Sequence, residues 1–238
     1  MGNLFSADLS AAFFVSVHRL DHLAFSFYTY YTAHKYCSNY RSIMAKLSDF
    51  VISRVRVKLL KTFLSQPKEM FYVRELTRIT HEEINAIRRE LQHMVDTGML
   101  KGEKRGNRLY YFFKPSYLFY PELLTLVAKS NGLGKDIIKN QRKLGHVKFA
   151  MLSGKFVRGL PYNQDEVDLL LVGQVVLPQL SVIVRTFEGK TGREVNYTVM
   201  TEEELLYRKT HRDPFVQSII HGTRVMLIGQ ETELVGEK

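Results

Sequence analysis

The strongest constraint on the fold is a series of three amphipathic helical patterns that ends in an alternating, hairpin-like pattern. The first, DFVISRVRVKLLKTFLSQP, repeats apolar residues at helical spacing and is ended by Pro67. FYVRELTRIT predicts a short extended entry and a second helix, and THEEINAIRRELQHMVDTG predicts a third. In the third pattern Thr80 and Glu83 have capping-box spacing, and Gly98 lies where a helix C-cap is expected.

The next segment, MLKGEKRGNRLYYFF, predicts two strands, Met99 to Lys104 and Arg108 to Phe113, with a turn at Gly106-Asn107. Three helices followed by a two-stranded hairpin predict a winged helix-turn-helix. YPELLTLVAK predicts one more helix, and SNGLG, with two glycines, is the best candidate linker. We therefore expect a DNA-binding winged helix-turn-helix domain at residues 44–130.

Beyond the linker the pattern changes to strands alternating with helices. Strands are expected in HVKFAML, VDLLLVG and REVNYTVM, and helices in KDIIKNQRKL, LPQLSVIVRTFEGK and TEEELLYRK. This alternation predicts a compact α/β domain over residues 131–238. Residues 1–43 have few charges and no sustained period, so we expect a poorly ordered extension, or a stretch that is not translated, with Met44 as the start. A docked helix in SAAFFVSVHRL is the alternative.

The positive charge is concentrated in the middle third of the chain. The 238 residues carry a formal net charge of +10, and residues 44–130 hold 16 basic against 9 acidic residues. Such a distribution favours a nucleic-acid partner, and a solvated basic face is the alternative. No stretch approaches the roughly 18 uninterrupted apolar residues of a membrane span, so no membrane contact is expected. The single cysteine, Cys37, indicates a reducing compartment, and we expect a cytoplasmic protein.

The predicted third helix, Glu82–Asp96, is the one that a helix-turn-helix places in the major groove of DNA. Side chains that suit base edges point away from its apolar face, and these are Asn85, Arg88, Arg89 and Gln92. Phosphate contacts are expected from the hairpin residues Lys101, Lys104, Arg105 and Arg108. A winged helix that binds another protein is the alternative.

Several of these segments resemble one family. FYVRELTRIT, INAIRRELQHMVDTGMLKGEKRGNRLYYF and YPELLTLVAKS resemble the winged-helix half of prokaryotic ArsR/MarR-like regulators fused to a minimal nucleotidyltransferase domain of the polymerase-beta superfamily. SGKFVRG, EVDLLLVG and GREVNYTVMTEEEL resemble the second half, and the resemblance covers Met44 to about Gly229. It implies an α+β protein of two domains, a winged helix-turn-helix followed by a small α/β nucleotidyltransferase-like domain with a mixed sheet.

In that family a Gly-Ser turn contacts the nucleotide phosphates, and an Asp-x-Asp step with a third carboxylate holds two Mg²⁺ ions. The resemblance implies phosphate contacts at Gly154, Lys155 and Arg158, and metal ligands at Glu166 and Asp168. Three positions depart from the pattern: Lys155 replaces the serine, Glu166 the first aspartate and Asn196 the third carboxylate. These departures favour a degenerate site, and no catalytic residue is assigned.

We therefore expect a transcriptional regulator that binds double-stranded DNA as a homodimer. Its second domain would contact a ligand such as a nucleotide, a partner protein or the second copy. No cofactor is expected unless the nucleotidyltransferase site is functional, in which case it is Mg²⁺. Whether the chain is an enzyme stays open, because the alternative is an active metal-dependent nucleotidyltransferase that modifies RNA, protein or a small molecule. One half of a toxin–antitoxin module is a third alternative.

Overall fold

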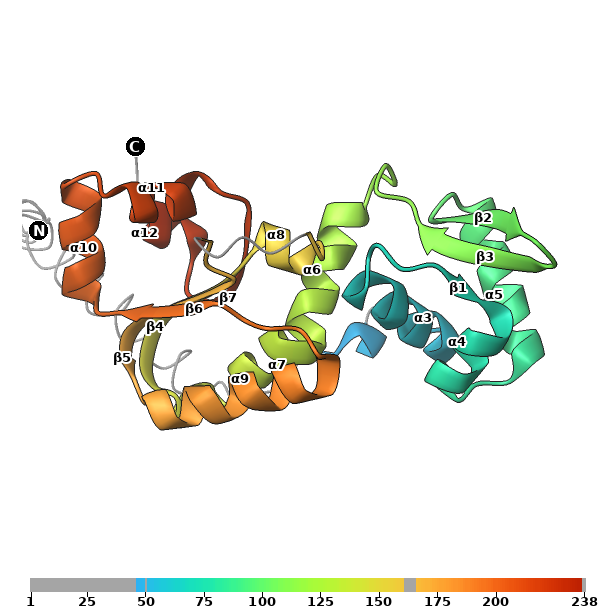
Figure 1. Ribbon diagram of the computed structural model, residues 1–238, viewed down its shortest axis with the longest axis horizontal. Coiled ribbons are helices and arrows are strands. Elements are labelled where there is room, and N and C mark those ends of the chain that lie inside the picture. The colour runs from blue at the N-terminus through green and yellow to red at the C-terminus, as the bar shows by residue number, and fades with distance from the viewer. Residues whose placement is uncertain (1–45, 50, 161–165, 237–238) are drawn as a thin grey trace, which may run out of the picture. The chain divides into compact units, whose positions relative to one another are not determined.

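The computed structural model describes residues 46–49, 51–160 and 166–236, and every structural statement below concerns these residues (Figure 1). The expected extension at residues 1–43 lies outside this part of the chain. The first half begins with a 3-10 helix, η1, and consists of η1 (Leu47–Asp49), α3 (Arg54–Ser65), β1 (Phe71–Tyr72), α4 (Val73–Thr80), α5 (Ile84–Asp96), β2 (Leu100–Arg105), β3 (Arg108–Phe113) and α6 (Tyr120–Ser130).

These elements share one apolar core beneath a small antiparallel sheet. The sheet has the order β1-β3-β2, and Arg105 pairs with Arg108 across the two-residue turn, as the hairpin pattern predicted. The helices α3, α4 and α5 bury the apolar faces that the periodicity indicated, with Leu59, Leu76 and Ile87 fully buried. Burial of these faces, more than helix propensity, stabilises such short helices.

The cap of α5 differs from the expected capping box. The Thr80 hydroxyl is buried and donates to the Leu76 carbonyl oxygen at 2.7 Å, so it does not cap α5. Glu83 is itself the N-cap residue, and its carboxylate accepts from the Ala86 N–H at 2.9 Å. The box prediction was wrong because Thr80 is the last residue of α4, where its hydroxyl finds a carbonyl one turn back. Gly98 follows the end of α5 with φ of +76°, as expected for a C-cap.

The predicted linker SNGLG is mostly helical. α6 ends at Ser130 and α7 (Gly132–Lys139) begins two residues later, which leaves Asn131 between them. Gly132 turns the chain with φ of +57°, and Gly134 lets the two helices touch, since a Cβ there would lie 2.2 Å from the Ala128 carbonyl oxygen. The two glycines therefore serve a tight helix–helix junction.

The second half contains a four-stranded sheet with helices on both sides (Figure 1). Its remaining elements are η2 (Gln141–Lys143), β4 (Gly145–Ser153), α8 (Gly154–Val157), β5 (Leu169–Val175), α9 (Leu177–Thr191), β6 (Tyr197–Met200), α10 (Glu202–Thr210), α11 (Pro214–His221), β7 (Arg224–Ile228) and α12 (Glu231–Val235). The sheet order is β6-β5-β4-β7, with β5 and β6 parallel and the other pairs antiparallel. The α+β class and the mixed sheet are thus confirmed.

Each face of this sheet is buried under its own set of helices. Leu169 and Leu171 of β5 pack with Leu180 of α9, while Leu170 of the same strand packs with Leu205 of α10. The uninterrupted apolar run LLLV follows from this, because a central strand that is covered on both faces has no polar side to present. Figure 1 shows α7 and α9 on one side of the sheet and α10, α11 and α12 on the other.

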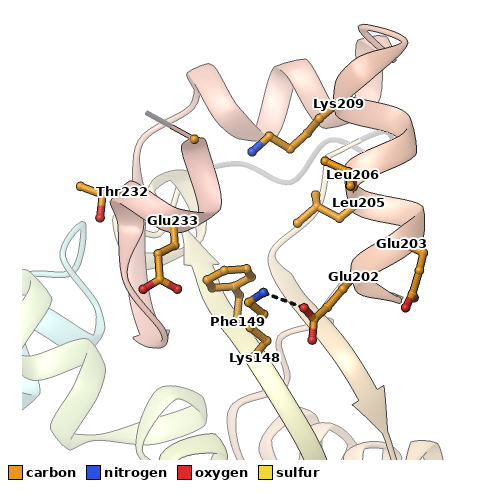
Figure 2. A pocket seen from close by; sticks show the side chains of 10 residues that line it. Lys148, Phe149, Glu202, Glu203, Leu205, Leu206, Lys209, Thr232 and Glu233 are labelled. Atoms are coloured by element: carbon orange, nitrogen blue, oxygen red, sulfur yellow. Dashed lines mark hydrogen bonds and ion pairs between the residues drawn. The ribbon is translucent and has the colours of Figure 1, made fainter. Parts of the chain in front are cut away.

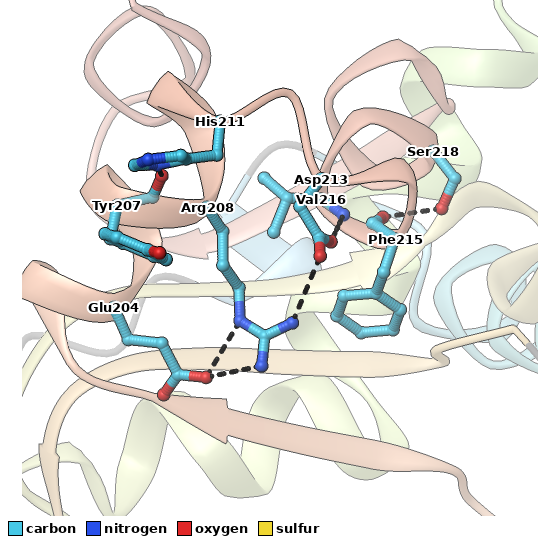
Figure 3. A network of polar contacts seen from close by, with 8 residues as sticks. All are labelled: Glu204, Tyr207, Arg208, His211, Asp213, Phe215, Val216 and Ser218. Carbon is cyan, nitrogen blue, oxygen red and sulfur yellow. Dashed lines mark hydrogen bonds and ion pairs between the residues drawn. The ribbon is translucent and has the colours of Figure 1, made fainter.

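A polar network joins α10 to α11 (Figure 3). Arg208 forms ion pairs with Glu204 at 2.9 Å and with Asp213 at 3.4 Å, and Asp213 also caps α11 by accepting from the Val216 N–H. Thr201 caps α10 by accepting from the Glu204 N–H at 3.1 Å. The network thus links the end of α10 to the start of α11. Among the described residues, no helix is long and apolar enough to span a bilayer.

Candidate functional site

The residues predicted to contact DNA form an exposed basic face on α5 and the β2–β3 hairpin. All eight predicted side chains belong to exposed residues: Asn85, Arg88, Arg89, Gln92, Lys101, Lys104, Arg105 and Arg108. Some of them already have neighbours. Gln92 donates to Asp96 at 2.7 Å, Arg105 pairs with Glu103 at 2.9 Å, and the Arg108 guanidinium lies 4.8 Å from the centre of the Tyr72 ring.

The predicted phosphate-binding turn is a four-residue helix, α8, with a closed environment. Ser153 caps it by accepting from the Phe156 N–H at 3.1 Å. Gly154 is buried against β7, where a Cβ would lie 2.1 Å from the Thr223 hydroxyl oxygen. The Arg158 guanidinium donates to two neighbours there, the Gly154 carbonyl oxygen at 3.0 Å and the Thr223 hydroxyl at 2.9 Å. Thr223 thus engages groups of the turn itself, since its carbonyl oxygen also accepts from the Gly154 N–H at 2.7 Å.

The predicted metal ligands precede β5, which begins at Leu169, so they do not share one face of a strand as expected. The Glu166 carboxylate forms an ion pair with Lys155. Asp168 is buried and accepts from the backbone N–H of Asn196 at 3.1 Å. The Asn196 side chain donates to the Glu166 carbonyl oxygen at 2.7 Å. In the described part of the chain no three His, Cys, Asp or Glu side chains gather as metal ligands.

Burial raises the pKa of the Asp168 carboxyl, and the Asn196 N–H and Arg193 oppose that rise. The same burial lowers the pKa of the Arg193 guanidinium, and Asp168 opposes that change. The two groups are thus a partly desolvated pair of opposite charge, and the cation belongs to a residue that the sequence did not single out.

Arg193 lies in the wall of a cavity of about 420 Å³, which we call the junction cavity. Its walls come from the turn after α3, the α6–α7 junction, α8 and the end of α9, with Pro67, Gly132, Phe156 and Phe187 among the lining residues. The Arg193 Nη1 donates to the Phe156 carbonyl oxygen at 2.9 Å, and its Cζ lies 3.8 Å from the centre of the Phe156 ring. The cavity therefore combines apolar walls with one half-buried cation.

A second, larger cavity of about 600 Å³ lies between β4, α10 and α12 (Figure 2). Both of its lysines already have partners. Lys148 pairs with Glu202 at 2.6 Å, and this hydrogen bond raises the pKa of Lys148. Lys209 donates to the Leu234 carbonyl oxygen at 2.9 Å. We prefer the junction cavity as the candidate site, because its cation is desolvated as well as charged.

The sequence patterns missed the residues of the junction cavity. Phe156 was part of the presumed phosphate turn and Phe187 lay in a predicted helix. Arg193 was the first residue of the predicted strand REVNYTVM, in which Asn196 was the position compared with the third carboxylate. A Gly-Arg step at the end of a helix, with Gly192 as the C-cap of α9, is the one local signal for Arg193. It is weak, because an arginine beside a glycine turn is usually solvated.

Comparison with known proteins gives little similarity. No family model matches the chain, and no curated protein matches it. Among solved structures, human N-acetylserotonin methyltransferase in complex with SAM matches at 13% identity and a TM-score of 0.26, over 79% of this chain and 48% of that chain. This chain therefore spans about half the length of that protein, and at such a TM-score the similarity carries no argument about activity.

These comparisons correct the predicted family and function. The structure that matches is a methyltransferase, not a winged-helix regulator fused to a nucleotidyltransferase domain, and no family model supports that resemblance. The assignment to that family was wrong, as was the predicted role as a DNA-binding transcriptional regulator with a nucleotidyltransferase-like domain, together with its nucleotidyltransferase alternative.

Proposed function

We propose that this chain binds a small organic molecule in the junction cavity. The observation that carries the proposal is Arg193, a half-buried cation stacked on Phe156 in the wall of a cavity of about 420 Å³. A volume of this order is typical of pockets that hold small ligands, which are lined mostly by apolar side chains with a few polar groups.

The energetics of Arg193 support this proposal. Taking a cation out of water costs free energy unless other groups replace the lost water contacts. Asp168 attracts Arg193 but also accepts a backbone N–H, and one Phe156 carbonyl accepts from the guanidinium. A bound molecule with hydrogen-bond acceptors would replace the remaining water contacts of the Arg193 guanidinium, and its apolar part would cover Phe156 and Phe187.

A thermal-shift screen of metabolites, nucleotides included, tests the proposal with the full chain. We expect at least one compound to raise the melting temperature, and Arg193→Ala to abolish that rise. The matched control is Arg185→Ala, since Arg185 is exposed on α9 and does not line the cavity. Two results would argue against this site. One is that no compound shifts the melting temperature of the wild-type chain, and the other is that the shift is equal in Arg193→Ala.

We also propose a domain arrangement, a contact with DNA and a homodimer for this chain. We infer a winged helix from the order of helix, short strand, two helices and hairpin in residues 44–130, and a separate small α/β domain at 131–238. The exposure of all eight predicted residues supports contact between the basic face and the phosphates of double-stranded DNA. Such contact implies no regulatory role.

A homodimer is proposed as well, and sedimentation equilibrium tests it.

A further inference from the structure

We infer that the ligand of the junction cavity is an aromatic monocarboxylate whose carboxylate pairs with the Arg193 guanidinium. This inference rests on the proposed function, because it names the chemical class of the molecule in the same cavity. Three features carry it: the hydrogen bonding of Arg193, the charge of the lining residues and the composition of the walls.

The guanidinium of Arg193 has capacity for a second partner. Of its five N–H donors, one is engaged within the described part of the chain, by the Phe156 carbonyl oxygen at 2.9 Å. The Phe156 ring holds the guanidinium from one side, with Cζ 3.8 Å from the ring centre, and accepts none of its N–H groups as a hydrogen bond. A guanidinium held in this way is preorganised for a planar acceptor with two oxygens, which describes a carboxylate.

The charge of the lining residues suits one negative charge. Three lining residues are charged: Lys68 and Glu69, both exposed, and Arg193. Their sum is one positive charge, and the nearby Asp168 lowers the positive potential further. Arg193 would offset the single charge of a carboxylate, whereas a phosphate dianion would bring a second negative charge near Asp168 at a further cost in desolvation.

The remaining walls favour an aromatic body. The rings of Phe156 and Phe187 lie 6.0 Å apart at an angle of 49°, and Leu64, Leu133, Leu152 and Leu160 add apolar surface. Aromatic rings pack well against such pairs and bury a large apolar area for few rotatable bonds. A ring that carries a short acidic arm would therefore place its carboxylate at Arg193 and its ring at the two phenylalanines.

Isothermal titration calorimetry with three matched compounds tests the class. The probes are phenylacetate, phenyl phosphate and 2-phenylethanol, which share the ring and differ in the polar group. We expect phenylacetate to bind at least about tenfold more tightly than either of the others. Arg193→Lys should weaken phenylacetate binding several-fold, because an ammonium lacks the planar fork, and Arg193→Met should abolish it. Arg185→Met is the control that leaves binding unchanged, and circular dichroism melting confirms that each variant folds.

The outcomes separate this inference from the proposed function. Phenyl phosphate or 2-phenylethanol binding as tightly as phenylacetate overturns the carboxylate class and leaves the cavity a ligand site. Phenylacetate binding that persists in Arg193→Met overturns the assignment to Arg193. If none of the three probes binds, the inference fails, and the thermal-shift screen then decides the proposed function independently.

Discussion

The guanidinium carbon of Arg193 lies 3.8 Å from the centre of the Phe156 ring, and the same side chain donates to the Phe156 carbonyl oxygen. One arginine thus contacts both the side chain and the backbone of a residue 37 positions earlier in the chain. The two contacts join the segment before β6 to α8 and build the charged wall of the junction cavity.

Phe156→Leu should destabilise the protein by about 1–3 kcal/mol, because it removes the cation–π contact and part of a buried ring. Urea denaturation measures the change. Phe187→Leu is the matched control, since Phe187 contacts the Phe156 ring but not the guanidinium, and it is less buried. An equal loss in both variants would show that the stacked cation contributes nothing beyond ring packing.

Asp168→Asn should stabilise the protein at neutral pH, and its advantage should shrink in acid. Burial raises the folded-state pKa of Asp168 above its unfolded value, so between the two pKa values the folded state binds more protons. The free energy of unfolding therefore falls as the pH rises from the unfolded-state pKa to the folded-state pKa of Asp168. Above the folded-state pKa, the wild-type protein bears the full cost of the buried, ionised carboxylate. Denaturation of both proteins across acidic to neutral pH checks this, and an advantage of Asn that grows in acid would contradict it.

Gly134→Ala should destabilise the protein by about 1–3 kcal/mol, although alanine is the better helix former. The new Cβ would lie 2.2 Å from the Ala128 carbonyl oxygen, so α6 and α7 must move apart. Gly189→Ala in α9 is the control, because a Cβ there meets nothing within 4 Å, and it should stabilise by about 0.5–1 kcal/mol. Thermal melts of the two variants should shift in opposite directions, and a shift of the same sign would refute the close-packed junction.

The double substitution Arg88→Ala/Arg89→Ala should weaken binding to duplex DNA at least about tenfold at fixed salt and reduce the dependence of affinity on salt concentration. Both residues are exposed on α5. Fluorescence anisotropy with a labelled duplex measures this, with Arg185→Ala as the control. Wild-type affinity in the double variant would remove α5 from the contact surface.

The fold was largely predictable because its elements bury one face each, and such faces leave a period in the sequence. The helices α3, α4 and α5, the β2–β3 hairpin and the strands β4 and β5 lie within a few residues of their predicted positions. Predictions failed where two local partners competed. Thr80 was expected to cap the next helix, but it bonds to Leu76 within its own helix. The glycines of SNGLG were expected in a linker, but they form a close helix contact.

The candidate site was not predictable, because it depends on distances between residues that are far apart in the chain. Sequence alone determined the order of helices and strands, the α+β class and the basic surface of α5 and the hairpin, since each follows from local periodicity and charge. Only the tertiary structure decided that Lys155 pairs with Glu166, that Thr223 accepts a hydrogen bond from Arg158 of the presumed phosphate turn, and that Arg193 stacks on Phe156. The physical reason is that burial and pairing of a charge are set by which surfaces pack together, and no local pattern records that.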